Sequence, residues 1–296
     1  MAISGIMVVK GSPRHIEASL SSLQQLVDEV IIADIGMDKG LSEKLSKNTK
    51  LRILPLPPVP YVELIREKLK GQAAHPYVFF LDPDEILSPS LIQMLKTNYE
   101  KFDYVSIPRK NIIFGKWIKN SRWWPDYQIR LFRKNAVIWP AQIHHQPTVT
   151  GKELKLENTQ ENAIEHYNYE SIDEYIEKAT RYAKAEAKEK IDAGAPFTLS
   201  TVIKNALSEY ISRFFAEEGY KDGIHGFMLA FLQMFYSFLV YFYYWEMKKR
   251  PEVEEKELVS LPETFFKQGV KETHYWMIEK KLKNNSLVEK IKNKLL

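Results

Sequence analysis

Three carboxylates follow directly on the apolar segment 77–81, in the order Asp82-Pro-Asp84-Glu85. An apolar run of this length is typical of a buried strand, and ligands bind at the carboxyl ends of parallel strands. Mg²⁺ and Mn²⁺ take oxygen ligands and leave coordination positions for substrate phosphates. The segment therefore predicts a metal-diphosphate site with Asp84 and Asp82 as ligands. A solvated turn is the alternative, because Asp and Pro also favour turns.

The elements that would position these carboxylates alternate along the first half of the chain. Strand-like segments at 3–9, 29–35, 51–56 and 77–81 are separated by helix-like periods at 14–27 and 62–74. Such alternation predicts an α/β fold, a Rossmann-like, mostly parallel sheet with helices on both faces. Asp34 would then end the second strand beside the same crevice as Asp82, where it could bind a nucleotide base or ribose. A turn or helix cap is its alternative role.

Composition narrows the classes of protein. The 296 residues are enough for one large domain with an appendage or for two domains. Cysteine is absent, which excludes thiolate metal sites, disulfides and cysteine nucleophiles. The net charge of +4 is too small to imply nucleic acid as a partner. No secretory signal is visible at the N-terminus, so we expect the catalytic end to be cytoplasmic.

Basic and aromatic residues are interleaved in the middle of the chain. Between positions 107 and 134 there are eight Lys or Arg residues, three Trp and a single acid, Asp126. Tryptophan faces stack on sugar rings and guanidinium groups bind phosphate or carboxylate, so this surface suits an anionic glycan acceptor. The same interleaving occurs in grooves for single-stranded nucleic acid, which we disfavour beside a sugar-nucleotide site. Asp126 is the candidate catalytic base, and a salt bridge to Arg130 or Arg122 is its alternative role.

Taken together, these segments resemble family 2 glycosyltransferases of the GT-A fold. The resemblance runs through Met7-Val-Val-Lys10, Val30-Ile-Ile-Ala-Asp34-Ile-Gly36 and Asp82-Pro-Asp84-Glu85. Later segments, Trp123-Trp-Pro-Asp126, Glu165-His166-Tyr167 and the stretch 219–226, look like the branch similar to lipopolysaccharide core β-1,4-glucosyltransferases. The resemblance covers about residues 3 to 247.

This resemblance implies an inverting hexosyltransferase that uses a UDP-sugar and Mg²⁺ or Mn²⁺. The hexose would be glucose, and the acceptor a sugar on a lipid-linked envelope glycan such as lipopolysaccharide core. The implied roles are uridine binding for Asp34, contact with the nucleotide phosphates for Arg66, donor and metal binding for Asp82, metal binding for Asp84, catalysis for Asp126, a reserve base at Glu85, and an additional metal ligand at His144.

The remainder of the chain reads as helical. Ser171-Ile-Asp-Glu174 is a capping box, and a second helix is expected from about 198 to 218. Residues 226–245 carry only Gln233 and Ser237 as clearly polar interruptions, a length and composition sufficient to cross a bilayer. Aromatic content and the basic residues at 248–250 favour a peripheral, monotopic position on the inner face of the plasma membrane. A buried helix or a dimer face is the alternative role.

We therefore expect a catalytic domain over 1–168, a helical, membrane-associating region over 169–250 and a charged, partly helical tail over 251–296. Two other functions stay open. A sugar-nucleotide-forming nucleotidyltransferase needs the same nucleotide fold and carboxylates, although Lys10-Gly-Ser-Pro13 is a poor phosphate loop. An inactive, membrane-associated glycan-binding homologue would explain Gly11 and Met37, where the chain departs from the family pattern.

Overall fold

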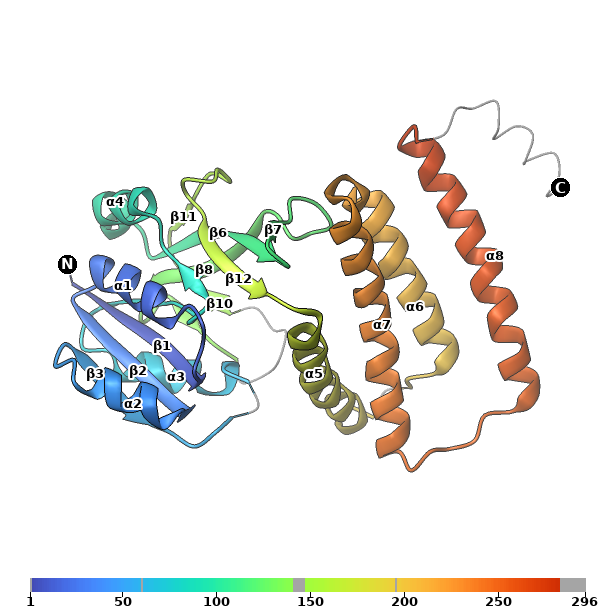
Figure 1. Cartoon of the computed structure of the whole chain (residues 1–296), viewed down its shortest axis with the longest axis horizontal. Coiled ribbons are helices and arrows are strands. Elements are labelled where there is room, and N and C mark those ends of the chain that lie inside the picture. Colours follow the sequence, from blue (N-terminus) through green and yellow to red (C-terminus); the bar gives the residue numbers. More distant parts are fainter. Residues whose placement is uncertain (1, 60, 141–146, 195, 283–296) are drawn as a thin grey trace. The chain divides into compact units, whose positions relative to one another are not determined.

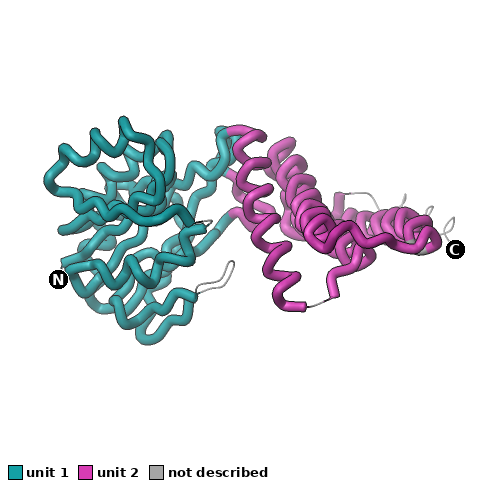
Figure 2. Tube along the Cα trace, turned by 90° about the horizontal axis from the view of Figure 1, so that it is seen from below, with its two compact units in different colours: residues 1–117, 124–170 teal, residues 118–123, 171–296 magenta. Residues whose placement is uncertain are grey.

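The computed structural model describes residues 2–59, 61–140, 147–194 and 196–282 (Figure 1). The chain divides into two compact units (Figure 2). The first unit holds residues 1–117 and 124–170. The second unit holds the residues after 170 together with the short segment 118–123. The structural division therefore falls at Glu170, and the two units are described separately below.

The first unit begins with alternating strands and helices. They are β1 (Ile3–Gly11), α1 (Ile16–Leu26), β2 (Glu29–Met37), α2 (Lys39–Ser46), β3 (Leu51–Pro55), α3 (Glu63–Gln72) and β4 (Tyr77–Phe80). The second half is richer in strands: β5 (Glu85–Ile86), α4 (Pro89–Asn98), the 3₁₀ turn η1 (Tyr99–Lys101), β6 (Tyr104–Ile113), β7 (Lys116–Trp117), β8 (Asp126–Arg133), β9 (Val137–Ile138), β10 (Thr148–Val149), β11 (Glu153–Lys155) and β12 (Ile164–Tyr169).

One sheet organises this unit, in the strand order β3-β2-β1-β4-β8-β6-β12-β5. Strand β1 runs parallel to β2 and β4, whereas β8 is antiparallel to both β4 and β6. Strands β7 and β11 pair with β6, and β9 and β10 form a separate two-stranded sheet. The predicted α/β class, with a mostly parallel sheet and C-terminal helices, is confirmed.

Both faces of the sheet are covered, which explains the nearly continuous apolar runs in its central strands. Met7 and Tyr77 belong to the hydrophobic cluster on the side that includes Leu23 of α1. Their sequence neighbours Ile6 and Val78 belong to the opposite cluster. Side chains alternate between the faces of a strand, so each of these strands contributes to two cores. This burial fixes the register that carries the polar side chains at the strand ends.

The second unit is helical, and its elements are α5 (Ile172–Asp192), α6 (Leu199–Ile211), the π-helical turn η2 (Ser212–Ala216), the 3₁₀ turn η3 (Gly219–Asp222), α7 (Ile224–Met247) and α8 (Glu255–Glu279). Helix α7 packs against α5 and α6, and α8 packs against α6. The predicted cap of α5 is confirmed, because the Ser171 hydroxyl accepts a hydrogen bond from the Glu174 N–H at 3.1 Å.

The segment 118–123 is held inside the helical unit by Asp222. Its carboxylate, which is 4% exposed, accepts hydrogen bonds from the backbone N–H groups of Lys119 at 3.2 Å and Asn120 at 2.9 Å. Close packing follows at the start of α7, where a Cβ on Gly226 would lie 1.8 Å from the carbonyl oxygen of Gly219. Only glycine fits at position 226 without moving the backbone.

Candidate active site

The Asp82–Glu85 turn is fastened to the sheet by hydrogen bonds from several directions. The backbone N–H of Glu85 donates to the carbonyl of Asp82 at 3.0 Å, and the Asp82 N–H donates to Glu85 Oε2 at 3.1 Å. From α1, the hydroxyl of Ser19 lies 2.9 Å from the Pro83 carbonyl oxygen and 2.6 Å from that of Glu85. The turn is therefore ordered by the fold and is more than a solvated connection.

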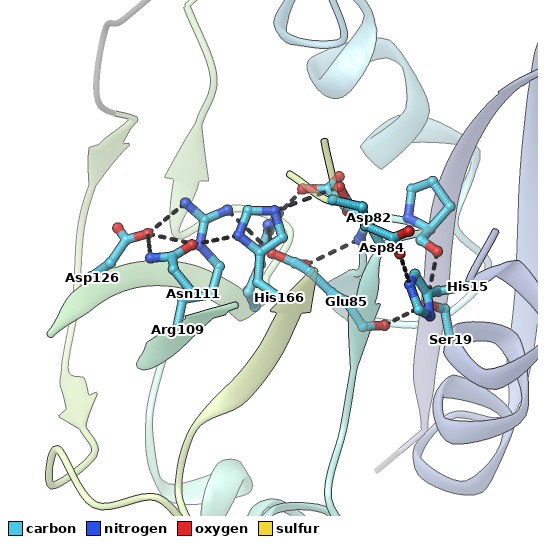
Figure 3. Close-up of polar contacts among 12 residues, drawn as sticks. His15, Ser19, Asp82, Asp84, Glu85, Arg109, Asn111, Asp126 and His166 are labelled. Atoms are coloured by element: carbon cyan, nitrogen blue, oxygen red, sulfur yellow. Dashed lines mark hydrogen bonds and ion pairs between the residues drawn. The ribbon is translucent and has the colours of Figure 1, made fainter. Parts of the chain in front are cut away.

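Four neighbouring strands bring polar side chains from distant parts of the sequence into one row. Glu85 of β5 is paired with His166 of β12, and His166 is paired with Asn111 of β6. On the other edge of β6, Arg109 is paired with Asp126 of β8. The row spans the sheet from the Asp82 turn to Asp126, as Figure 3 shows.

Arginines link these carboxylates into a continuous ion-pair network. Arg130 Nη2 lies 2.6 Å from Asp82 Oδ2 and also contacts Glu85 Oε1. Arg109 continues the chain, with Nη1 at 3.2 Å from Glu85 Oε1 and Nη2 at 2.6 Å from Asp126 Oδ2. The network therefore connects the predicted metal-diphosphate turn to the predicted catalytic base.

Ion pairing compensates for the burial of these charged groups. Glu85 is fully buried and Arg130 is 1% exposed, an environment in which an unpaired charge would be strongly destabilising. Burial alone would raise the pKa of Asp82, but the positive charges of Arg130 and Arg66 hold that pKa well below its ordinary value. Burial likewise opposes the charge of Arg130, whereas Asp82 and Glu85 raise its pKa overall.

Asp126 is ionised by its surroundings. Burial disfavours its charge, but Arg109, Asn111 and Gln128 outweigh that effect and lower the pKa of this carboxyl. Gln128 donates to Oδ1 at 2.8 Å, and Arg109 and Asn111 donate to Oδ2. The side chain is 23% exposed, and both of its oxygens accept hydrogen bonds from the protein.

The alternative role predicted for Asp126, a salt bridge to Arg130 or Arg122, is wrong in its partners. Arg130 is bound to Asp82 and Glu85, and Arg122 lies in the helical unit, where it pairs with Glu209 at 3.3 Å. Arg109 is the partner of Asp126 because it lies directly opposite on the neighbouring strand. An ion pair is thus present, and it holds the partly exposed side chain of Asp126 in place.

Glu85 has a different environment from the one expected of a reserve base. Its carboxylate accepts hydrogen bonds from Arg109, Arg130 and the Asp82 N–H, and none of the residue is exposed. A general base has to come within hydrogen-bonding distance of the proton that it removes. The burial of Glu85 argues against that role and assigns it to positioning the two arginines.

Asp84 lies near His166, which was not predicted from the sequence as a metal ligand. His166 Nε2 lies 3.5 Å from Asp84 Oδ2, and the ring is 4% exposed. His144, the residue chosen from the sequence, lies outside the described residues. Within the described ranges no group of three or more His, Cys, Asp or Glu side chains is arranged to hold a metal ion. Asp84 and His166 form a two-residue donor set, which suits an ion whose other ligands are phosphate oxygens and water.

The two predicted nucleotide-binding residues lie at the same edge of the sheet. Arg66 of α3 has its Nη2 3.9 Å from Asp82 Oδ2, and its guanidinium lies 4.7 Å from the centre of the Trp139 ring. Asp34 of β2 uses Oδ1 to accept the N–H groups of Gly36 at 2.8 Å and Met37 at 2.7 Å. Arg66 therefore joins the network, whereas Asp34 stabilises its own turn.

Sequence analysis did not name Arg109 and Asn111 as members of the site. It named Arg130 only as an alternative partner of Asp126, and His166 only as part of the family resemblance. All four lie on strands, and Arg109 and Asn111 are two residues apart, so they point to the same face of β6. Polar residues with this spacing inside otherwise apolar strands were the available signal. Their partners could be assigned only once the strand order was known.

Comparison with known proteins places the chain beside proteins named as glycosyltransferases, although no family model matches it. It is 22% identical over 248 residues to an uncharacterized glycosyltransferase of Rickettsia typhi, covering 80% of this chain and 84% of that protein. It is 23% identical over 251 residues to an uncharacterized glycosyltransferase of Rickettsia bellii, with the same coverage of both chains.

Among solved structures, the fold is similar to that of S. aureus TarS 1-349 in complex with UDP. The identity is 13%, the TM-score is 0.44, and the match covers 86% of this chain and 95% of that one. The complex of the same fragment with UDP-GlcNAc matches at 15% identity with a TM-score of 0.43. These likenesses are too distant to assign a ligand to this chain.

Proposed function

We propose that the protein is an inverting glycosyltransferase that transfers a hexose, with glucose as the first candidate, from a nucleoside diphosphate sugar. The observation that carries the proposal is the ion-pair network. It joins Asp82, near the Asp84 carboxylate, to the partly exposed Asp126 through Arg130, Glu85 and Arg109. Similarity to proteins named as glycosyltransferases along most of the chain supports the same class.

The chemistry needs a base for the acceptor and positive charge for the leaving group. An acceptor hydroxyl oxygen forms a bond to the anomeric carbon while the bond from that carbon to the diphosphate oxygen breaks. Asp126 takes the hydroxyl proton, and its low pKa keeps it in the basic form. Arg66, held at the edge of the network, faces the negative charge that develops on the diphosphate.

A divalent cation fits this site as an additional source of positive charge. The site contains four carboxylates, at Asp82, Asp84, Glu85 and Asp126, and three guanidinium groups, at Arg66, Arg109 and Arg130. A bound cation would balance the remaining negative charge. Asp84 and His166 would hold it. When bound, Mg²⁺ or Mn²⁺ would neutralise the leaving diphosphate.

Two variants test the proposal. With a UDP-sugar, Mn²⁺ and a truncated lipid-linked glycan as acceptor, we expect Asp84→Ala to lose both turnover and Mn²⁺-dependent donor binding. Asp126→Asn should lose turnover yet keep donor affinity, because it removes only the base. Asp173→Asn, an acid in the first turn of α5, is the matched control.

The products separate this function from the others. Release of nucleoside diphosphate together with an extended glycan supports transfer. Formation of pyrophosphate from a sugar phosphate and a nucleoside triphosphate would identify the protein as a nucleotidyltransferase instead. Glycan binding without turnover under every donor would identify an inactive binding protein. Wild-type turnover in Asp126→Asn would remove Asp126 as the base.

The helical unit supports a second part of the proposal, attachment to the cytoplasmic face of the plasma membrane. Among the described residues, α7 is the one helix long and apolar enough to cross a bilayer, and 28% of its apolar window is buried. Four phenylalanines at helical spacing lie on its surface with 37% to 50% of each residue exposed: Phe227, Phe231, Phe235 and Phe242. The basic residues 248–250 follow immediately and are also exposed.

An exposed aromatic stripe next to basic residues favours an interfacial position on an anionic membrane. We infer that this stripe of four phenylalanines, the α7 stripe, inserts at the headgroup level and leaves the chain on one side of the bilayer. Such attachment would bring the active site to a lipid-linked acceptor. It also agrees with basic residues remaining on the cytoplasmic side.

Co-sedimentation with phosphatidylglycerol-containing vesicles tests the attachment. Replacing Phe231 and Phe235 together by Ser should weaken binding at least tenfold, because burying each ring contributes about 1.5–3 kcal/mol. Phe266→Ser on α8 makes the same chemical change at an exposed site outside the stripe and should change binding less. Equal loss in both variants contradicts the assignment of the stripe. Resistance to alkaline extraction from cell membranes contradicts a peripheral mode.

A further inference from the structure

Asn111 lies between the candidate base, Asp126, and the candidate cation ligands, His166 and Asp84. It is fully buried on β6, opposite His166 on β12. Its amide nitrogen Nδ2 lies 3.1 Å from Asp126 Oδ2, and its oxygen Oδ1 lies 2.6 Å from His166 Nδ1. Asn111 therefore contacts both groups with the two ends of one amide (Figure 3).

Asp126 determines which way the amide points. Its carboxylate forms an ion pair with Arg109, so it carries no proton and can only accept hydrogen bonds. The NH₂ group of Asn111 must then face Asp126, and the carbonyl oxygen must face His166. The reverse orientation would place an amide oxygen against a carboxylate oxygen at 3.1 Å, with no hydrogen between them.

The amide in turn determines the proton on His166. An amide oxygen cannot donate, so Nδ1 must carry a hydrogen to make the 2.6 Å contact. In the neutral ring the other nitrogen, Nε2, then has a free lone pair. Nε2 is the atom that lies 3.5 Å from the carboxylate of Asp84, and two acceptors at that separation favour a cation shared between them.

We propose that Asn111 is a positioning residue that holds the His166 proton on Nδ1 and so presents Nε2, together with Asp84, as ligands for a divalent cation. The inference rests on the proposed function and extends it. Hydrogen bonds join Asp126 to Asn111 and Asn111 to His166, and His166 Nε2 then lies 3.5 Å from Asp84 Oδ2. This connection from the base to the cation site runs separately from the arginine network. Partners of this kind orient metal-binding histidines and raise their basicity.

The first experiment observes the ring protons of the metal-free wild-type protein, and a variant serves only to assign the signal. Long-range ¹H–¹⁵N correlation spectra of the histidine rings, with His166 assigned by its disappearance in His166→Gln, should show a protonated Nδ1 and an unprotonated Nε2. A proton on Nε2 with Nδ1 bare overturns the proposal.

The second experiment measures Mn²⁺ affinity without any donor, from the electron paramagnetic resonance signal of free Mn²⁺. Asn111→Ala should raise the Kd for Mn²⁺ by about 10- to 100-fold, the usual effect of losing such a partner. Circular dichroism and thermal unfolding establish that the variant is folded. The control is Asn168→Ala, which changes a second buried asparagine, on β12. It should leave the Kd for Mn²⁺ within about twofold of the wild-type value.

Unchanged Mn²⁺ affinity in a folded Asn111→Ala protein overturns the proposal, as does a wild-type protein that does not bind Mn²⁺. These results are independent of turnover. If Asn111→Ala keeps both transfer and Mn²⁺ affinity while transfer still depends on Asp126, the positioning role of Asn111 is wrong and the proposed transferase function remains. Loss of the proposed transferase function instead appears as the absence of nucleoside diphosphate release by the wild-type protein.

Discussion

The two units of this protein depart from the ordinary distribution of residues in opposite directions. The first unit buries charge: Glu85 and Arg130 are almost completely inaccessible, and each is ion-paired. The helical unit exposes hydrophobic surface, because the α7 stripe presents four phenylalanine rings to the surroundings. Folding alone favours neither arrangement, since buried charges lose hydration and exposed rings gain none of the free energy of burial.

The difference shows how each departure is balanced. The network compensates internally, with a guanidinium opposite each buried carboxylate and hydrogen bonds to the remaining oxygens. The α7 stripe is compensated only in part, because Phe227 and Phe231 contact the rings of Tyr210 and Phe214 yet keep more than 40% of each residue exposed. In the proposed attachment, an external apolar phase would cover the exposed part. The proposed chemistry lies in the first unit and the proposed attachment in the second, and each proposal can be broken by a defined change.

The largest effect should come from removing Arg130. Arg130→Met leaves Asp82 and the fully buried Glu85 without their main cation, and removing one member of a buried ion pair costs about 3–5 kcal/mol. Urea unfolding of the full chain measures the loss. Arg122→Met breaks an exposed pair with Glu209 and should cost about 0–1 kcal/mol. If the two variants lost similar amounts of unfolding free energy, the buried ion pairs of Arg130 would not stabilise the protein more than an exposed pair does.

Acid should weaken the network next. The pKa values of Asp82 and Asp126 are lowered in the folded protein, so the unfolded chain binds protons first as the pH falls. Their contribution to stability is complete above the ordinary carboxyl pKa of about 3.9 and is lost as the pH drops below it toward the folded-state values. The free-energy difference between wild type and Asp126→Asn should therefore narrow from pH 5 to pH 2.5. A constant difference would show that Asp126 is not held in its charged form.

The smallest effect on folding should come from the α7 stripe. Phe231→Ala on the exposed side should change the free energy of unfolding in solution by no more than about 0.5 kcal/mol. Leu229→Ala, on the fully buried side of the same helix, should cost about 2–5 kcal/mol. A large loss from Phe231→Ala would mean that the stripe is part of a protein core or a subunit interface.

Much of the fold was determined by local sequence. The apolar segments at 3–9, 29–35 and 77–81 gave strands because their residues prefer extended backbone and are buried on both faces. The cap at Ser171 could be predicted from four residues, since the hydrogen bond that it forms spans only three positions. The candidate turn at Asp82–Glu85 was likewise visible because an apolar strand ends beside clustered carboxylates.

The partners within the site were decided by tertiary structure alone. Asp126 pairs with Arg109, and Asp84 meets His166, because β8, β6, β12 and β5 lie side by side in the sheet. Their separation in sequence carries no information about that order, and eight basic residues between 107 and 134 made several pairings chemically equivalent. The same holds for Asp222, whose carboxylate holds a loop 102 positions away in the sequence at Asn120. Sequence thus specified which groups are available for chemistry, whereas strand order and burial selected the ones that act together, because ion pairs and hydrogen bonds depend on distances of a few ångströms that no local pattern encodes.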